Sequence, residues 1–353
     1  MQTVGIKYAG SKLKLLPQIL NIIAEVKPKT VFRCFSGTTR VSQALAQSGY
    51  AVISNDTAPF SKVFATAALL NKKPAAYYQS FINRLNGLDD INGWYSQNYG
   101  GLNIDGKSIG ADGLKKPFQL HNTVKLDAIL LELDNYQFES EIERDTILAC
   151  VILALDKVDS TLGHQVSYLK EWSKRSFNQF KIEFPFTIVE GQHKVLQQDA
   201  NTITDEIDLA YLDPPYCSAN VKMPSSRVRY AAYYHIYNTI CLGDKPELFG
   251  KAKRRLDSSD KISYSAYEDF KGTAAQDRLF ELFSNLNTKH ILLSYNDNGI
   301  IKLDDLVSHI KFNYKLLSIT KLGYKKHVMA NMVWTNEWKI DSANNEYLIL
   351  FEK

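Results

Sequence analysis

One short stretch, Asp213-Pro214-Pro215-Tyr216 (hereafter the tetrad), constrains most strongly how this chain can fold. It directly follows the apolar run 207–212, which is short, partly β-branched and ends before a proline, as a buried strand does at its carboxyl end. In open α/β sheets, ligands bind beyond the carboxyl ends of the strands. The sequence therefore predicts an α/β fold in which the tetrad lies at the ligand-binding edge.

The residue types of the tetrad suit the binding of a planar ring that carries an exocyclic amine. Asp213 can accept a hydrogen bond from the amine, and the two prolines lack an N–H, so this loop offers carbonyl acceptors and few donors. Two acceptors that face one amino nitrogen can draw its lone pair out of conjugation and aim it at an electrophile. Tyr216 offers a face on which a flat base can stack. A simple strand-to-loop turn is the alternative, because Asp and Pro are common in turns.

A βαβ unit is predicted near the N-terminus. Strands are expected over 30–35 and 51–56 and helices over 41–47 and 61–70, with the turn Ser36-Gly37-Thr38-Thr39 after the first strand. Asp56 stands about twenty residues beyond the glycine, a spacing that lets a carboxylate bind ribose hydroxyls. The single glycine makes a poor dinucleotide fingerprint, and a βαβ core without a ligand is the alternative.

The first twenty residues contain a loop that opens a helix. Gly10-Ser11 makes a tight backbone, and apolar residues from Leu13 to Ile23 recur at helical spacing. Such a loop can cradle an anion or a carboxylate. An ordinary capped amphipathic helix explains the same pattern.

Composition narrows the class of protein. With 353 residues, 45% of them hydrophobic, the chain can form one large domain or two smaller ones. There is no apolar run long enough to span a membrane, no secretory pattern, and no metal-ligand spacing among the four scattered cysteines. We therefore expect a cytoplasmic protein with no membrane partner and no metal. The net charge of +4 permits a nucleic-acid partner without requiring one.

The middle of the chain loses the alternation of strands and helices. We expect a long loop over 93–113 and helices over 124–133 and 141–158. The segment 163–178 then interleaves aromatic residues with basic ones, which suits a surface that contacts phosphates and bases, although a solvated helix fits equally well. The basic residues in question are Lys170, Lys174 and Arg175.

Positive charge is concentrated after the tetrad. From Lys222 to Arg255 there are eight Lys or Arg and two acidic residues, a local charge of +6 that exceeds the net charge of the whole chain. This concentration fits a phosphate backbone held over the pocket, with a solubilising loop as the alternative. The candidate contacts are Lys222, Arg227, Arg229, Arg254 and Arg255. A helix over 276–286 and late strands over 291–295, 314–319 and 346–351 are expected to complete the sheet.

These motifs resemble those of a known family. Asp-Pro-Pro-Tyr and the opening string from Lys7 to Lys12 are similar to the signatures of the D12-class, Dam-like DNA adenine-N6 methyltransferases. The stretches 234–255 and 291–299 more narrowly resemble the FokI-type modification methylases of type IIS restriction systems. The resemblance implies a Rossmann-like, S-adenosylmethionine-dependent methyltransferase sheet with an inserted, mainly helical target-recognition domain. The parts would be cofactor-binding residues 1–73, inserted residues 74–185 and catalytic residues 186–353.

The resemblance also implies roles for single residues. The tetrad would be catalytic and would act on an adenine flipped out of double-stranded DNA. S-adenosylmethionine would be bound by Tyr8, Gly10, Lys12, Phe35, Ser36, Gly37, Thr38 and Asp56, with Asp199 and Ala200 against its adenine. A cognate restriction endonuclease is a possible partner. This chain departs from the family at Thr39, where a second glycine is common, and at 324–327, where Tyr-x-Arg is usual.

Three alternatives stay open. RNA base methyltransferases carry a similar tetrad but typically lack the insertion. A non-catalytic DNA-binding subunit could retain the fold, although the intact tetrad, Gly37 turn and Asp56 argue against it. Protein glutamine methyltransferases usually carry Asn where Asp213 stands.

Overall fold

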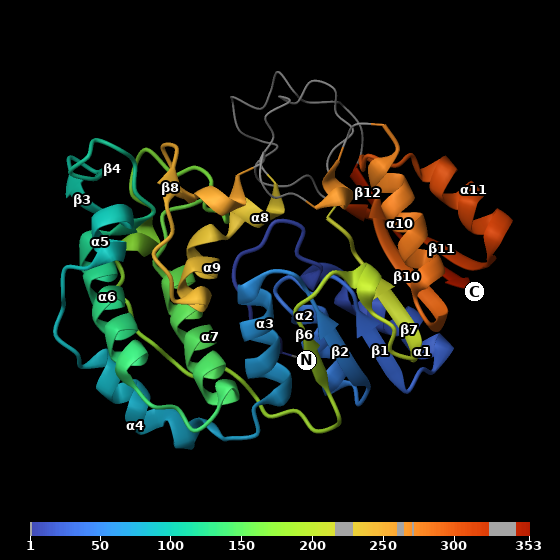
Figure 1. Ribbon diagram of the computed structural model, residues 1–353, viewed down its shortest axis with the longest axis horizontal. Coiled ribbons are helices and arrows are strands. Elements are labelled where there is room, and N and C mark those ends of the chain that lie inside the picture. The colour runs from blue at the N-terminus through green and yellow to red at the C-terminus, as the bar shows by residue number, and fades with distance from the viewer. Residues whose placement is uncertain (1, 216–228, 260–264, 270–271, 325–343) are drawn as a thin grey trace.

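A seven-stranded, mainly parallel sheet forms the larger half of the molecule (Figure 1). The computed structural model describes residues 2–215, 229–259, 265–269, 272–324 and 344–353. The strand order is β11-β12-β10-β7-β1-β2-β6. In the described sheet β12 pairs antiparallel with both of its neighbours, β10 and β11, and the other pairs are parallel. The strands are β1 (Thr30–Arg33), β2 (Ala51–Asn55), β6 (Lys194–Leu196), β7 (Ile207–Leu212), β10 (Thr288–Asn296), β11 (Lys315–Tyr324) and β12 (Asn344–Glu352).

Alternating side chains of the central strands bury both faces of this sheet. On β7, Leu209 and Tyr211 pack with α1 (Leu16–Val26) and α2 (Arg40–Gln47) on one face. Ala210 and Leu212 pack on the other face, with α10 (Ala274–Asn285) and α11 (Leu303–Asn313). Because both faces are covered, the strand reads as a continuous apolar run. The α/β fold expected from the sequence is confirmed, with β7 bounded as predicted.

The order in which the chain adds strands to the sheet changes sides between the parallel neighbours β7 and β1. From β1 the chain proceeds outward through β2 to β6, then returns to β7 and continues to β10 on the other side. The carboxyl ends of β1 and β7 therefore diverge into loops that leave a crevice, which is the usual ligand position in such sheets.

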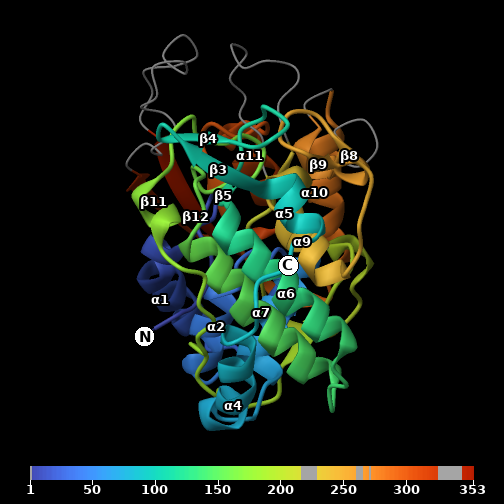
Figure 2. The same cartoon turned by 90° about the vertical axis from the view of Figure 1, so that its left-hand side faces the viewer.

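Helices form most of the second half, which faces the viewer in Figure 2. Its core joins α4, α5, α6 and α7 to α3 and α9, which come from outside the range 74–185. The segment 74–185 therefore shares its core with neighbouring segments, and an inserted domain with these boundaries stays a prediction. The helices are α3 (Pro59–Ala65), α4 (Ala75–Asn86), α5 (Trp94–Tyr99), α6 (Leu120–Asn135), α7 (Glu141–Lys157), α8 (Tyr230–Tyr233) and α9 (His235–Leu242). A π-helix, Thr66–Leu70, extends α3, and 3₁₀ turns cover Leu13–Leu15, Lys174–Phe177, Ala200–Thr202, Leu256–Ser258 and Ala266–Glu268.

The expectation of a long loop over 93–113 is wrong. This segment forms α5, then β3 (Gly100–Ile104) and β4 (Lys107–Ile109), which pair antiparallel, while β5 (Phe118–Gln119) adds a third strand. The buried Asp127 carboxylate of α6 accepts hydrogen bonds from the backbone N–H groups of Gly93, Tyr95 and Ser96 and so holds the start of α5. A second small pair joins β8 (Leu248–Phe249) and β9 (Arg254–Arg255). Among the described helices, none has the length and apolar character needed to cross a membrane.

Asp208 fastens β7 to β1 at the amino end of the sheet. Its Oδ2 accepts from the backbone N–H of Lys29 and of Thr30, both at 2.8 Å, and from the Thr30 hydroxyl at 3.1 Å. The Thr30 backbone bond, aided by the others, lowers the pKa of this carboxyl against an opposing effect of burial.

We predict that Asp208→Asn lowers the free energy of unfolding at pH 7 by about 1 kcal/mol, because the carboxylate is exposed and water screens its bonds. A lowered folded-state pKa stabilises above the unfolded-state pKa, about 4, and this contribution is lost as pH falls through the folded-state value. The difference between variant and wild type, measured by urea unfolding, should therefore shrink below about pH 4. Asp205→Asn, which removes a surface partner of Lys194, is the control and should change stability by less than about 0.5 kcal/mol. Parallel pH profiles for Asp208→Asn and wild type would contradict the assignment.

Candidate functional site

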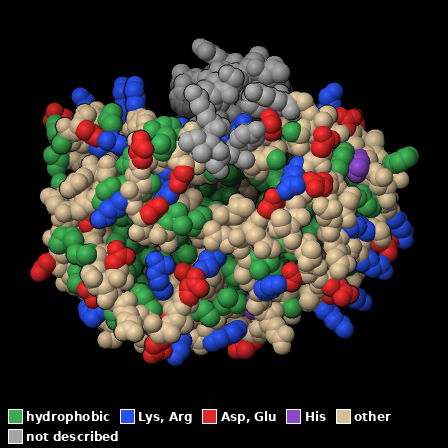
Figure 3. Space-filling view, viewed as in Figure 1, with side chains coloured by type: hydrophobic (Ala, Val, Ile, Leu, Met, Phe, Trp, Pro, Cys, Tyr) green, Lys and Arg blue, Asp and Glu red, His purple; other side chains and the backbone are tan. Residues whose placement is uncertain are grey.

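A cavity of about 830 Å³ opens at the carboxyl edge of the sheet, between the sheet and the helical half. Figure 3 shows a hollow in the middle of this face, with hydrophobic side chains in its wall. Its lining comes from the N-terminal loop, from the loops that follow β1, β2, β6 and β7, and from α8 and the segment after it. Cavities of this size accommodate ligands of cofactor dimensions.

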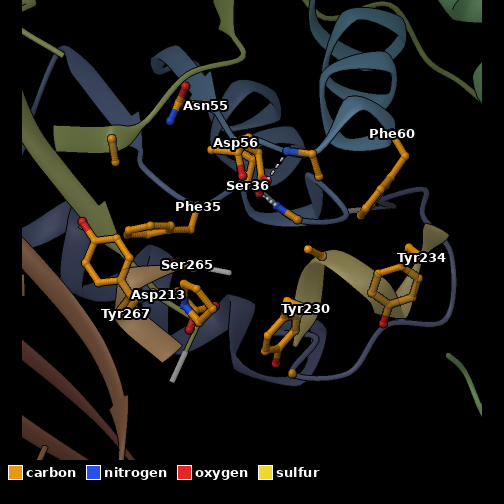
Figure 4. Close-up of a pocket in the computed structure, with 18 of the residues that line it drawn as sticks. Phe35, Ser36, Asn55, Asp56, Phe60, Asp213, Tyr230, Tyr234, Ser265 and Tyr267 are labelled. Carbon is orange, nitrogen blue, oxygen red and sulfur yellow. Dashed lines mark hydrogen bonds between the residues drawn. The ribbon is translucent and has the colours of Figure 1, made fainter. Parts of the chain in front are cut away.

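The turn after β1 forms one wall of this cavity. Gly37 has φ +52°, a conformation that glycine adopts without strain. Its N–H donates to Asp56 Oδ2 at 2.7 Å, and the N–H of Ala58 donates to Asp56 Oδ1 at 2.9 Å (Figure 4). Burial raises the pKa of Asp56, and these backbone donors oppose the rise. Each carboxylate oxygen retains acceptor capacity for a ligand hydroxyl.

Thr39 takes the left-handed conformation at the start of α2, with φ 61° and ψ 5°. A β-branched residue is rare there because its Cβ crowds the backbone. Its hydroxyl accepts from Gln43 Nε2 at 2.9 Å, and the side chain is fully buried. Position 39 therefore has a backbone conformation that glycine favours, and this chain adopts it with threonine.

Aromatic rings form the wall nearest the helical half. Tyr8 stacks on Tyr234 with ring centroids 4.8 Å apart, and Phe60 and Tyr230 flank the pair. Figure 4 shows Phe60, Tyr230 and Tyr234 on the same side of the cavity. The Tyr234 hydroxyl accepts from the N–H of Ala9 at 2.8 Å. Burial, with Asp56 next in effect, holds the pKa of Tyr8 well above its usual value, so its ring stays neutral.

The opposite end of the cavity carries a second aromatic pair and an ion pair. Tyr267 meets Phe35 edge-on at 5.1 Å, and Figure 4 shows the two rings side by side. Asp199, which follows β6, accepts from Arg278, a residue that the sequence did not single out. Ala200 is buried beside this pair in the lining. Phe35 lines the cavity, and an aromatic face of this kind can stack on a planar ring.

Asp213 lies at the centre of a nearly buried cluster of four charges. Its Oδ1 is 3.1 Å from Lys12 Nζ, and its Oδ2 is 3.2 Å from Arg33 Nη2. Lys12 Nζ also lies 2.8 Å from Glu346 Oε1. Burial raises the pKa of the Asp213 carboxyl, and the neighbouring Lys12 and Arg33 cations oppose that rise.

Two members of this cluster, Arg33 and Glu346, were not predicted as site residues from the sequence. Arg33 is the one charged residue in the apolar strand 30–35, and its guanidinium lies 4.5 Å from the ring centroid of Tyr211. Glu346 is an acid in the run 346–351, which is otherwise apolar or aromatic. A charge inside a predicted buried strand was the available signal, because buried charges need partners.

The predicted nucleic-acid contacts divide into two groups. Lys170 and Lys174 are exposed and Arg254 is half-buried, with its guanidinium 4.6 Å from the Phe249 ring centroid. Arg175 is bound to Asp159, and the mostly buried Arg229 and Arg255 are held inside, by the Glu268 carbonyl and by Asp244 with Asp257 respectively. Arg175, Arg229 and Arg255 therefore contact other residues of this chain. Tyr216, Lys222 and Arg227 lie outside the described residues.

The described residues contain no group of three or more His, Cys, Asp or Glu that could hold a metal ion. The donors gathered around the cavity are instead carboxylates, backbone groups and rings.

A family model described as "D12 class N6 adenine-specific DNA methyltransferase" matches residues 8–309, which is most of the chain. The chain belongs to this D12 family. Its match begins at Tyr8, contains the Gly37 turn and the tetrad, and ends before β12, the strand that carries Glu346.

Several characterised methylases are similar to this chain at modest identity. Modification methylase StsI of Streptococcus sanguinis is 29% identical over 92% of this chain and 49% of that protein. Type II methyltransferase M.FokI of Planomicrobium okeanokoites is 28% identical over 91% and 49%, which confirms the predicted likeness. The chain therefore spans about half the length of these two relatives. Type II methyltransferase M.NlaIII of Neisseria lactamica is 27% identical over 98% of this chain and 99% of that protein.

The contact between Gly37 and Tyr8 gives a stability test. A Cβ at Gly37 would lie 3.1 Å from Tyr8 Cζ, whereas a Cβ at Gly49, also left-handed with φ +89°, would meet nothing within 4 Å. Gly49→Ala should cost about 1 kcal/mol of unfolding free energy from the backbone alone. Gly37→Ala should cost about 2–3 kcal/mol, because the Tyr8 ring must also shift. Equal losses in chemical unfolding would show that the turn and ring do not pack as described.

Proposed function

We propose that this protein transfers a methyl group from S-adenosylmethionine to the exocyclic N6 of an adenine in duplex DNA, as the modification enzyme of a restriction system. The observation that carries the proposal is Asp213, held at the carboxyl end of β7 on the rim of a cofactor-sized cavity. Family membership supports the reaction class.

The residues around the cavity fit S-adenosylmethionine. Asp56 has the acceptor capacity for ribose hydroxyls, and the space against Phe35, near Asp199 and Ala200, suits the adenine ring. The loop from Tyr8 to Lys12 would receive the methionine end beside Asp213. When bound, the cofactor supplies an electrophilic methyl group on a cationic sulfur.

The chain's own residues would orient the nucleophile. Asp213 and the carbonyl of Pro214 would accept hydrogen bonds from the adenine amine and aim its lone pair at the methyl group. Tyr216 would stack on a base flipped out of the duplex. The amine becomes acidic once it is methylated, so its proton can leave afterwards and no strong base is required.

DNA would bind across the rim of the cavity. Lys170 and Lys174 are exposed, and the backbone carbonyl of Lys170 accepts a hydrogen bond from the N–H of Ser108 in β4. Figure 1 shows β4 near the upper edge of the helical half. Lys222 and Arg227 belong to the basic segment after the tetrad and are proposed as further contacts. Neutralisation of phosphates by such residues makes binding sensitive to salt.

Asp213→Ala should lower the rate of methyl transfer to duplex DNA by about 10³-fold, because the amine loses its charged acceptor. The rate is measured by incorporation of labelled methyl groups, and the product by mass spectrometry of nucleosides. Binding of S-adenosylhomocysteine, measured by calorimetry, should persist and so show that the cavity is intact. An active Asp213→Ala protein would overturn the proposal.

The same assay separates the alternatives. Methylation of an RNA duplex in preference to DNA would favour an RNA methyltransferase. Failure of the wild type to bind S-adenosylmethionine would favour a non-catalytic DNA-binding subunit.

Lys170→Ala and Lys174→Ala should each reduce the slope of log K against log salt concentration by about 1 in DNA-binding titrations, since each would lose one phosphate contact. Lys289→Ala is the matched control, because Lys289 is also exposed but pairs with Glu352 on the sheet, away from the cavity. Its slope should equal that of the wild type. Unchanged slopes for both test variants would remove this surface from the DNA site.

A further inference from the structure

We propose that Glu346 sets the electrostatic preference of the site for the cationic methyl donor over its neutral product, acting through Lys12 as a positioning residue. The inference rests on the proposed function, because it concerns the same cavity. Glu346 lies on β12, after the last residue matched by the family model.

The argument begins with the charges at the catalytic edge. Lys12, Arg33 and Asp213 line the cavity, and these three groups alone carry one net positive charge. Glu346 does not line it, but its carboxylate is 2.8 Å from Lys12 Nζ and is 4% exposed. Among the described residues, the cluster with Glu346 holds two cations and two carboxylates, whose charges balance.

The position of Glu346 is fixed by the sheet. It stands opposite Asn296 across the β10–β12 pair, and the Ser294 hydroxyl of β10 donates to Oε1. Oε1 therefore receives both a hydroxyl and an ammonium from defined directions. The carboxylate can neutralise Lys12 without reaching the ligand.

The reaction geometry places the sulfur of the donor close to this cluster. The amine must lie within hydrogen-bond reach of Asp213, and the methyl carbon about 3–3.5 Å from the amine nitrogen, with the sulfur one bond further on. A sulfonium from which this amine takes the methyl group would therefore lie within about 8 Å of Asp213. One uncompensated positive charge there would repel S-adenosylmethionine, which carries a positive sulfur. It would leave S-adenosylhomocysteine, with its neutral thioether, almost unaffected.

The test compares the dissociation constants of these two ligands by calorimetry on the full chain. Glu346→Gln keeps the shape of the side chain and removes its charge. It should weaken S-adenosylmethionine about tenfold while changing S-adenosylhomocysteine by less than about twofold. Glu346→Asp, which restores the charge, should restore most of the preference.

Two further variants make the test specific. Ser294→Ala removes the hydroxyl that supports Glu346 but no charge, so the ratio of the two constants should stay near that of the wild type. Lys12→Gln removes one positive charge from the cluster and should shift the ratio in the opposite direction, toward S-adenosylmethionine. Loss of direct contacts from Lys12 affects both ligands and cancels in the ratio.

The outcomes distinguish this inference from the proposed function. A wild type that binds neither ligand would overturn the proposed function. A wild type that binds both, with Glu346→Gln weakening both equally, would overturn the inference alone and show a purely structural role. If Glu346→Gln does not fold, the ratio in Lys12→Gln decides, and an unchanged ratio there overturns the inference.

Discussion

The ion pairs of Asp213 with Lys12 and Arg33 tie together parts of the chain that are distant in sequence. A carboxylate placed in a nearly buried position is unstable unless cations approach it closely. The N-terminal loop, β1 and β7 must therefore converge at one point, and Glu346 brings β12 to the same point through Lys12. The parallel neighbours β7 and β1, together with the antiparallel strand β12, supply that convergence. The strand order thus brings the two cations and the two carboxylates together, and their close pairing offsets the cost of burying them.

The same strand carries a carboxylate at each end, in opposite circumstances. Asp208, at the exposed amino end of β7, accepts three hydrogen bonds from β1 and the residue before it, which lower its pKa. Asp213, just beyond the carboxyl end, is held by cations in a site where burial raises its pKa. Asp208 fixes the register between β7 and β1. This register places Asp213 at the crevice. A shift of one residue in this pair would point each side chain to the wrong face.

The sheet, the turn at Gly37 and the positions of Asp56 and Asp213 after their strands could be predicted from the sequence, because hydrophobic runs and turn residues are local signals. Glu346 and Tyr234 could not be predicted, because their contacts with the N-terminal loop join residues more than two hundred positions apart. The count of positive charge after the tetrad could not reveal that Arg255 is enclosed by Asp244 and Asp257. The polar composition of 93–113 suggested a loop, whereas contacts with α6 hold α5 in place.

The aromatic wall links the two halves of the molecule. Tyr230 belongs to α8 and Tyr234 directly precedes α9, yet both contact the N-terminal loop that borders the cavity, through the hydrogen bonds of Ala9. The core of the helical half also includes α3, which follows directly after Asp56. A displacement of these helices would therefore also move Tyr8 and Phe60, two of the rings that line the cavity. Because packed interiors respond to strain as units, the shape of the cavity depends on how the helical half packs against the N-terminal loop.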